Sequence, residues 1–171
     1  MDILRREFKV KFVFALSVLV ASQLPAQPAR DRTAIQDIVQ DETNAWNKGD
    51  AVSYSRHFAS AGTFTNVRGE FTVGREVFVK KHEVIFQGIF KNTTAKQDIV
   101  SLVFPDRNVA VVETLTSISG MAQLSPGTST DAKGRLRTRL LQVVVRQRGE
   151  WKVIAYHNVD VKPGVVVPEP Q

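Results

Sequence analysis

The chain has 171 residues, of which 43% are apolar and 23% charged, and it contains no cysteine. This length suits one ordinary globular domain and leaves little room for two. The lack of cysteine excludes disulfides, thiolate metal sites, iron–sulfur clusters and cysteine nucleophiles. With 8% aromatic residues and only 10 glycines and 7 prolines, the composition also excludes collagen-like and wholly disordered chains. We therefore expect one packed core.

The N-terminal segment has the pattern of a secretory signal. Four basic residues, the last of them Lys11, precede the ten-residue apolar run Phe12–Ala21, and small residues follow as far as Ala29. The run is too short to span a membrane, which takes about 20 residues. We predict that residues 1–26 are a signal peptide. The mature protein should be periplasmic or secreted, with no stable membrane anchor after cleavage.

The charge pattern disfavours nucleic-acid binding. Cleavage near Ala26 removes four basic and two acidic residues, so the formal net charge falls from +6 to +4. The remaining lysines and arginines are dispersed and form no block that could follow a phosphate backbone. We expect no nucleic-acid partner.

One amphipathic helix is predicted at the start of the mature chain. Apolar residues recur at helical spacing over Ile35–Trp46, and Glu42 lies in the same stripe. Asp31 or Thr33 can cap the start of the helix, and the sequence at 47–49, Asn-Lys-Gly, is typical of its end.

Two further helices are expected. Asp50 can cap a short second helix, whose apolar side includes Tyr54 and Phe58. The third helix is predicted from Gly74 to about residue 90, with His82 on its apolar side.

The rest of the chain has the two-residue periodicity of strands. Short extended segments are expected at 63–67 and 71–73, and four antiparallel strands at about 93–104, 108–119, 136–147 and 150–161. Residues 120–134 should form a mobile loop and residues 163–171 a flexible C-terminal tail. The predicted fold is α+β, with three N-terminal helices packed on a curved, mainly antiparallel sheet over residues 31–162.

A strand register follows if residues 148–149 form a two-residue hairpin turn, because Arg139 then pairs with Asn158. Strand alternation predicts one face, assigned to the pocket beneath the helices, that carries Glu113, Arg139, Tyr156 and Asn158. The opposite face, predicted to form a homodimer, carries Gln142, Val144, Trp151 and Val153. A single bulge would exchange part of this assignment.

The polar residues of the predicted pocket are the candidates for chemistry. Glu113 could act as a general base, because an apolar cavity raises the pKa of a carboxyl group, and His82 could transfer protons. A tyrosine could donate a hydrogen bond to an enolate oxygen. The candidate ligand-binding residues are Tyr54, Asn66, Arg139, Tyr156 and Asn158.

Each of these residues also has a structural interpretation. Glu113 and Arg139 can form a cross-strand ion pair on the sheet, and this pair would lower the pKa of the carboxyl group. His82 can be a core histidine whose hydrogen bonds are satisfied. Asn66 precedes Arg68-Gly69 and can be a turn former.

Several segments in the same order resemble the SnoaL-like, nuclear transport factor 2-like superfamily, and most closely its SgcJ/EcaC-like branch. They are AWNKGD, AGTFTNVRGEFTVGRE, VAVVET and GEWKVIAYHN, with Phe58 and His82 between them. The resemblance covers residues 31–160 and implies a cone-shaped fold. Members of the superfamily include isomerase-like and dehydratase-like enzymes, polyketide cyclases and pure binding modules, so the fold leaves the function open.

Three functions remain open at the level of the sequence. The protein could bind a small apolar or carbonyl-containing ligand, it could be a cofactor-free isomerase or cyclase that abstracts a proton next to a carbonyl, or it could be a dimeric assembly module. We expect no metal, because the three histidines lack metal-site spacing. We expect no cofactor either, because the chain has no glycine-rich phosphate loop.

Overall fold

The computed structural model describes residues 27–167. The predicted signal peptide, residues 1–26, and the end of the predicted tail, residues 168–171, lie outside the described residues.

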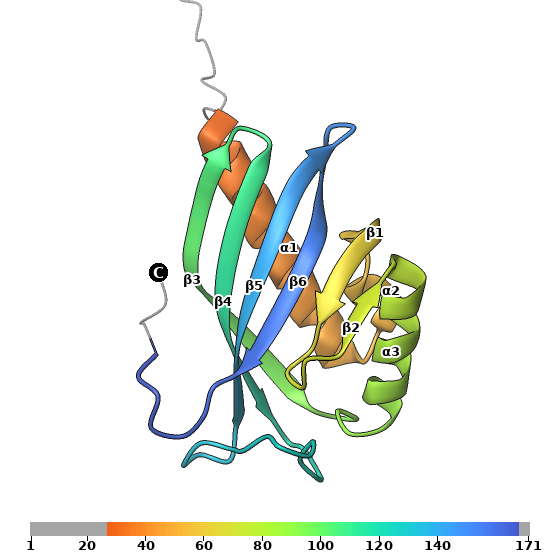
Figure 1. Cartoon of the computed structure of the whole chain (residues 1–171), viewed down its shortest axis with the longest axis vertical. Helices are drawn as coiled ribbons and strands as arrows, with labels where there is room; N and C mark the ends of the chain where they lie inside the picture. The colour runs from red at the N-terminus through yellow and green to blue at the C-terminus, as the bar shows by residue number, and fades with distance from the viewer. Residues whose placement is uncertain (1–26, 168–171) are drawn as a thin grey trace, which may run out of the picture.

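Three helices cover one face of a curved sheet (Figure 1). They are α1 (Gln27–Lys48), α2 (Ala51–Tyr54) and α3 (Arg75–Gln87). Helix α1 begins four residues before Asp31, so neither Asp31 nor Thr33 caps its start, and it ends at Lys48; the φ of 66° at the next residue, Gly49, is the left-handed conformation that glycine adopts readily. Asp50 caps α2 as predicted, since its Oδ1 accepts a hydrogen bond of 2.9 Å from the backbone N–H of Ser53.

The sheet has six strands in the order β2-β1-β6-β5-β4-β3. They are β1 (Phe58–Thr65), β2 (Phe71–Val73), β3 (Thr94–Asp106), β4 (Val109–Ser119), β5 (Leu136–Gln147) and β6 (Glu150–Asp160). All neighbouring strands are antiparallel except β1 and β6, which are parallel. The predicted α+β class and the antiparallel pairing of the last four strands are therefore confirmed.

Phe58 lies elsewhere than predicted. Helix α2 ends at Tyr54, and Phe58 opens β1 rather than lying on the apolar side of the second helix. Its ring stacks on Phe78 of α3 at a centroid distance of 4.2 Å. This tertiary contact outweighs the helical pattern of the short segment.

A bulge in β6 decides which residues in the second half of this strand face the helices. The predicted register holds from the hairpin turn as far as the pair Val144 and Val153, but the next pair is Val143 and Ala155. Ile154 is thus the extra residue on β6, and every later position of this strand is displaced by one. Arg139 consequently pairs with Val159 and not with Asn158.

The predicted dimer face is in fact the core face. Gln142, Val144 and Val153 have no exposed surface, and Trp151 is 7% exposed. Beyond the bulge, Tyr156 joins this buried face, because the extra residue turns it toward the helices. The assignment of Tyr156 to the pocket face is therefore correct, although the predicted alternation is broken by the bulge.

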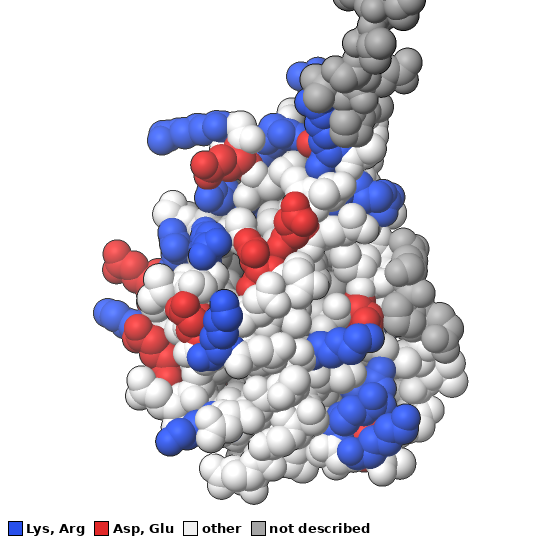
Figure 2. Space-filling model, turned by 180° about the vertical axis from the view of Figure 1, so that it is seen from behind, with Lys and Arg blue, Asp and Glu red and all other residues white. Residues whose placement is uncertain are grey.

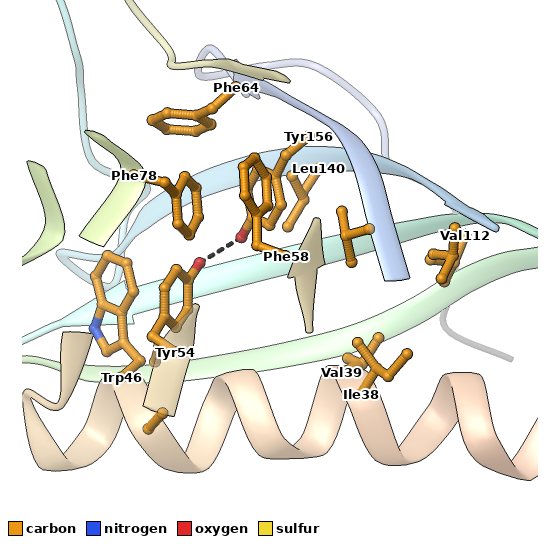
Figure 3. Packing of buried hydrophobic residues seen from close by; sticks show 14 of the residues in the cluster. Ile38, Val39, Trp46, Tyr54, Phe58, Phe64, Phe78, Val112, Leu140 and Tyr156 are labelled. Atoms are coloured by element: carbon orange, nitrogen blue, oxygen red, sulfur yellow. Dashed lines mark hydrogen bonds between the residues drawn. The ribbon is translucent and has the colours of Figure 1, made fainter. Parts of the chain in front are cut away.

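Helix α1 anchors the core against the sheet. Ile35, Ile38 and Val39 are at most 4% exposed and belong to the hydrophobic cluster whose side chains Figure 3 shows in part. At the end of the helix, the Asn47 side chain donates to the backbone carbonyl of Ala95 and accepts from its N–H. These two bonds fix α1 against the start of β3.

The described surface over α1 carries no continuous patch of one charge sign. Figure 2 shows lysine and arginine side chains dispersed among acidic ones on this side of the molecule.

No helix in residues 27–167 is long and apolar enough to cross a membrane.

Candidate functional site

A cavity of about 600 Å³ lies between the helices and the curved sheet. Its walls come from the ends of α1 and α2, from α3, from the inner face of the sheet and from the loop after β4. Most of the lining is apolar, and pockets of about 300 to 1,000 Å³ accept small organic molecules. The apolar lining residues include Trp46, Phe64, Ile85, Ile89, Phe90, Ile118, Leu136 and Leu140.

Two tyrosine hydroxyl groups meet at the cavity. Tyr54 of α2 and Tyr156 of β6 share a short hydrogen bond, which Figure 3 marks, and each side chain is only 4% exposed. Burial raises the pKa of both phenols well above their usual range. Both groups are therefore neutral and can present a hydroxyl to a bound molecule.

His82 of α3 lies beside this pair as a neutral imidazole. Its Nδ1 is 2.8 Å from the carbonyl oxygen of Phe78. Because a carbonyl oxygen can only accept a hydrogen bond, Nδ1 carries the proton and is the donor. The ring is 4.7 Å from the ring of Tyr54 and 4.1 Å from that of Phe78. Burial lowers the pKa of His82 to about 4. His82 therefore lines the cavity as a hydrogen-bond acceptor through Nε2 and carries no charge at neutral pH.

The sheet wall adds neutral polar groups. Thr138 and Asn158 line the cavity, and the Oγ1 of Thr138 and the Oδ1 of Asn158 are buried without a hydrogen-bond partner. An unpaired buried polar atom is unfavourable, so both atoms are available to a ligand or to water.

Asn66 is the turn former that was considered for it, and it also lines the cavity. It lines the cavity at the β1–β2 turn. Its Oδ1 also accepts hydrogen bonds of 2.9 Å and 3.0 Å from the backbone N–H groups of Arg68 and Glu70. The side chain therefore builds the turn that forms part of the cavity mouth.

The prediction that Glu113 and Arg139 face the pocket was wrong. The two residues form an ion pair with each other on the outer face of the sheet, and neither lines the cavity. Their side chains are 25% and 39% exposed. The physical reason is that the helices cover the other face of β4 and β5, the one that carries Gln142 and Val144, whereas the bulge at Ile154 moved only the end of β6, with Tyr156, onto that face. The alternative of a structural cross-strand pair describes them correctly.

Glu42 is a polar core residue that sequence reasoning did not propose for the site. It is 3% exposed and accepts a hydrogen bond of 2.7 Å from the Nε2 of Gln142. Burial raises the pKa of its carboxyl group to about 8. The sequence feature that could have identified Glu42 as a core residue is the position of its carboxylate within the apolar stripe of the first helix. Glu42 does not line the cavity, but its charge raises the pKa values of Tyr54 and Tyr156.

The structure thus brings together five of the seven predicted site residues, which are Tyr54, Asn66, His82, Tyr156 and Asn158. Within residues 27–167, no three histidine or acidic side chains gather in a way that could hold a metal ion.

Solved structures share this architecture. An NTF-2-like protein of unknown function from Shewanella oneidensis MR-1 is 13% identical, with a TM-score of 0.63 over 76% of this chain and 99% of that one. A putative scytalone dehydratase from Novosphingobium aromaticivorans DSM 12444 is 15% identical, with a TM-score of 0.65 over 84% and 95% of the two chains. A ketosteroid isomerase-like protein from Erwinia carotovora atroseptica SCRI1043 is also 15% identical, with a TM-score of 0.60 over 77% and 96%.

The chain has the nuclear transport factor 2-like fold. The cone-shaped fold implied by the sequence resemblance is therefore confirmed, while the SgcJ/EcaC-like branch stays a prediction. No family model and no curated protein matches the chain. Neighbours on this fold bear different functional names, so the function has to be inferred from the site itself.

Proposed function

We propose that this protein is an exported small-molecule-binding protein that holds an apolar or carbonyl-containing ligand in its cavity. The observation that carries the proposal is the cavity of about 600 Å³, with mostly apolar walls and a few neutral polar groups. The neutral polar groups are hydroxyls, an imidazole and amides, which can orient a ligand by hydrogen bonds. None of them requires a charged partner inside the cavity.

A fluorescent probe tests this function. N-phenyl-1-naphthylamine, an uncharged aromatic molecule, becomes brightly fluorescent in apolar surroundings and should bind the purified protein at one site. Ile89→Trp places a larger side chain in the half-buried cavity wall and should weaken binding at least tenfold. Val52→Trp is the matched control, because Val52 is 59% exposed and does not line the cavity. Equal binding by all three proteins would refute the cavity as the site.

Export is supported by the sequence of the first 26 residues. N-terminal sequencing of native protein should find a mature start between about residues 22 and 31. Met1 retained on a cytoplasmic protein would contradict the proposal. Native mass spectrometry of the same material should detect a small molecule that accompanies the chain.

A cofactor-free isomerase or cyclase is the second candidate. The pairing of Tyr54 with Tyr156 favours it, because a buried hydroxyl can donate to a developing enolate oxygen, and His82 could accept the α-proton through Nε2. The lowered pKa of His82, about 4, makes it a weak general base at neutral pH. This weakness is why we rank binding above catalysis.

Proton abstraction can be measured without knowledge of the natural substrate. 2-Tetralone in deuterated buffer exchanges its α-protons slowly, and an enzyme of this type should accelerate the exchange seen by NMR. His82→Gln should abolish the acceleration. Exchange at the uncatalysed rate with the wild-type protein would exclude this activity toward small aromatic ketones.

A third candidate, a dimeric assembly module, now involves the outer sheet face. The residues predicted for the dimer are buried under the helices, whereas Val103, Leu141 and Val159 on the outer face of the sheet are 40% to 53% exposed. We propose that a homodimer forms through this outer face, because a partner would cover these apolar side chains.

A further inference from the structure

Charge is distributed unevenly along the cavity. Its interior contains no charged side chain, because His82 is neutral and Glu42 does not line it. The formally charged lining residues in the described part of the chain are Arg68, Glu70, Lys80 and Lys81. They come from only two places, the β1–β2 turn and the middle of α3.

These four residues form a cationic mouth. Glu70 is the single carboxylate, and it already contacts two cations, with Lys81 Nζ at 3.1 Å from Oε2 and Arg68 Nη2 at Oε1. Lys80 is exposed and makes no ion pair within residues 27–167. Three cations against one carboxylate leave the mouth with a formal charge of +2.

The acidic residues of α3 lie outside the cavity lining, next to Lys80. Glu76 and Glu83 are exposed and lie outside the lining, whereas Lys80 and Lys81 belong to it. Helical spacing places Glu76 four residues before Lys80 and Glu83 three residues after it, so both carboxylates weaken the positive charge near Lys80 without lining the cavity.

We infer that the ligand is an amphipathic anion, with an apolar body in the cavity and an acidic head group, such as a carboxylate or sulfonate, at Lys80 and Lys81. An anion inside the cavity would lose its hydration without a counter-charge, which is very costly. At the mouth the same anion keeps contact with water and gains two or three cations. This inference rests on the proposed binding function and adds the charge class of the ligand.

Glu70 has a defined role in this arrangement. It competes with the head group for Lys81 and Arg68, since both cations already contact its carboxylate. Removing its charge should therefore tighten anion binding, while removing the lysine charges should weaken it. A purely structural role of these exposed side chains would not produce effects of opposite sign.

Two probes with the same aromatic body separate charge from shape. 1-Anilinonaphthalene-8-sulfonate carries a sulfonate, and N-phenyl-1-naphthylamine lacks it. The wild-type protein should bind the sulfonate more tightly at low salt, and 0.5 M NaCl should reduce this preference, because the mouth is solvent-exposed. The measured quantity is the dissociation constant of the neutral probe divided by that of the sulfonate, so a larger ratio means a stronger preference for the anion.

Four variants assign the preference to the mouth. The double variant Lys80→Gln, Lys81→Gln should reduce the ratio about fourfold to twenty-fivefold, at about two to five times per exposed charge, without changing the affinity for the neutral probe. Glu70→Gln should increase the ratio about twofold to fivefold. Lys91→Gln and Asp37→Asn are the matched controls, because both residues are exposed, lie outside the lining and are not helical neighbours of Lys80 or Lys81. Neither control should change the ratio by more than its error.

The outcomes separate the two proposals. If the neutral probe binds and the sulfonate has no advantage, or if the advantage survives in the double lysine variant, the anion inference is wrong and the binding function stands. If neither probe binds, the proposed function fails and the inference fails with it.

Discussion

The hydroxyl groups of Tyr54 and Tyr156 share a hydrogen bond at the cavity, although 102 positions separate the two residues in the chain. Both side chains are almost fully buried. Removing one hydroxyl leaves the other without its partner, which costs about 1 to 3 kcal/mol for a buried group. Removing both hydroxyl groups leaves no buried hydroxyl without a hydrogen-bond partner.

Tyr54→Phe and Tyr156→Phe should therefore each lower the free energy of unfolding by about 1 to 3 kcal/mol, and the double variant should lose less than the sum of the two. Urea denaturation of the four proteins gives the coupling energy, which we expect to be about 1 kcal/mol or more. Simple additivity would mean that water replaces the missing hydroxyl in each single variant.

Glu42 should make stability depend on pH. Its pKa is raised from 4.5 to about 8, so between these values the folded state retains a proton that the unfolded state has lost. The contribution of Glu42 is therefore fully present below about pH 4.5 and is lost as the pH rises through about 8. Glu42→Gln keeps an acceptor for Gln142 and cannot ionise, so it should be more stable than wild type at pH 8 by a few kcal/mol at most.

Urea denaturation of wild type and Glu42→Gln at pH 5, 6.5 and 8 measures this effect. The difference between the proteins must be taken at each pH, because His82 contributes in the opposite direction. Its lowered pKa gives stability that is present above about pH 6.5 and is lost as the pH falls through about 4. A constant difference between pH 5 and pH 8 would refute the raised pKa of Glu42.

The ion pair of Glu113 and Arg139 should contribute little to stability. Both side chains are partly exposed, and such pairs contribute about 0 to 1 kcal/mol. Arg139→Met should therefore lower the free energy of unfolding by about 1 kcal/mol or less, and probe binding should not change, since neither residue lines the cavity. Weaker probe binding by Arg139→Met in calorimetric titration would contradict this prediction, because it would mean that a residue on the outer face affects the pocket.

Leu141 tests the proposed dimer. It is 40% exposed on the outer face of β5, so Leu141→Glu should place a charge within the interface and yield monomers in sedimentation velocity. Val166→Glu is the control, because Val166 is 91% exposed beyond the last strand. A monomeric wild-type protein would exclude the dimer.

The antiparallel strands and the first helix could be predicted from the sequence because their signals are local. Ile35, Ile38 and Val39 recur at helical spacing, and all three are core residues. The hairpin turn at Arg148 and Gly149 has positive φ at both residues, as a two-residue loop of this type requires. His82 was placed correctly on an apolar helix face for the same reason.

The sequence predicted the fold class, the main helices and strands, and five of the residues that line the cavity, because these follow from local patterns. Only the tertiary structure decided which sheet face lies under the helices. Ile154 is as suitable for a regular strand as its neighbours, so no local preference revealed the bulge that turns Tyr156 inward and leaves Arg139 outside. The neutral state of His82 and the raised pKa of Glu42 also arise from burial, which depends on segments far apart in the chain.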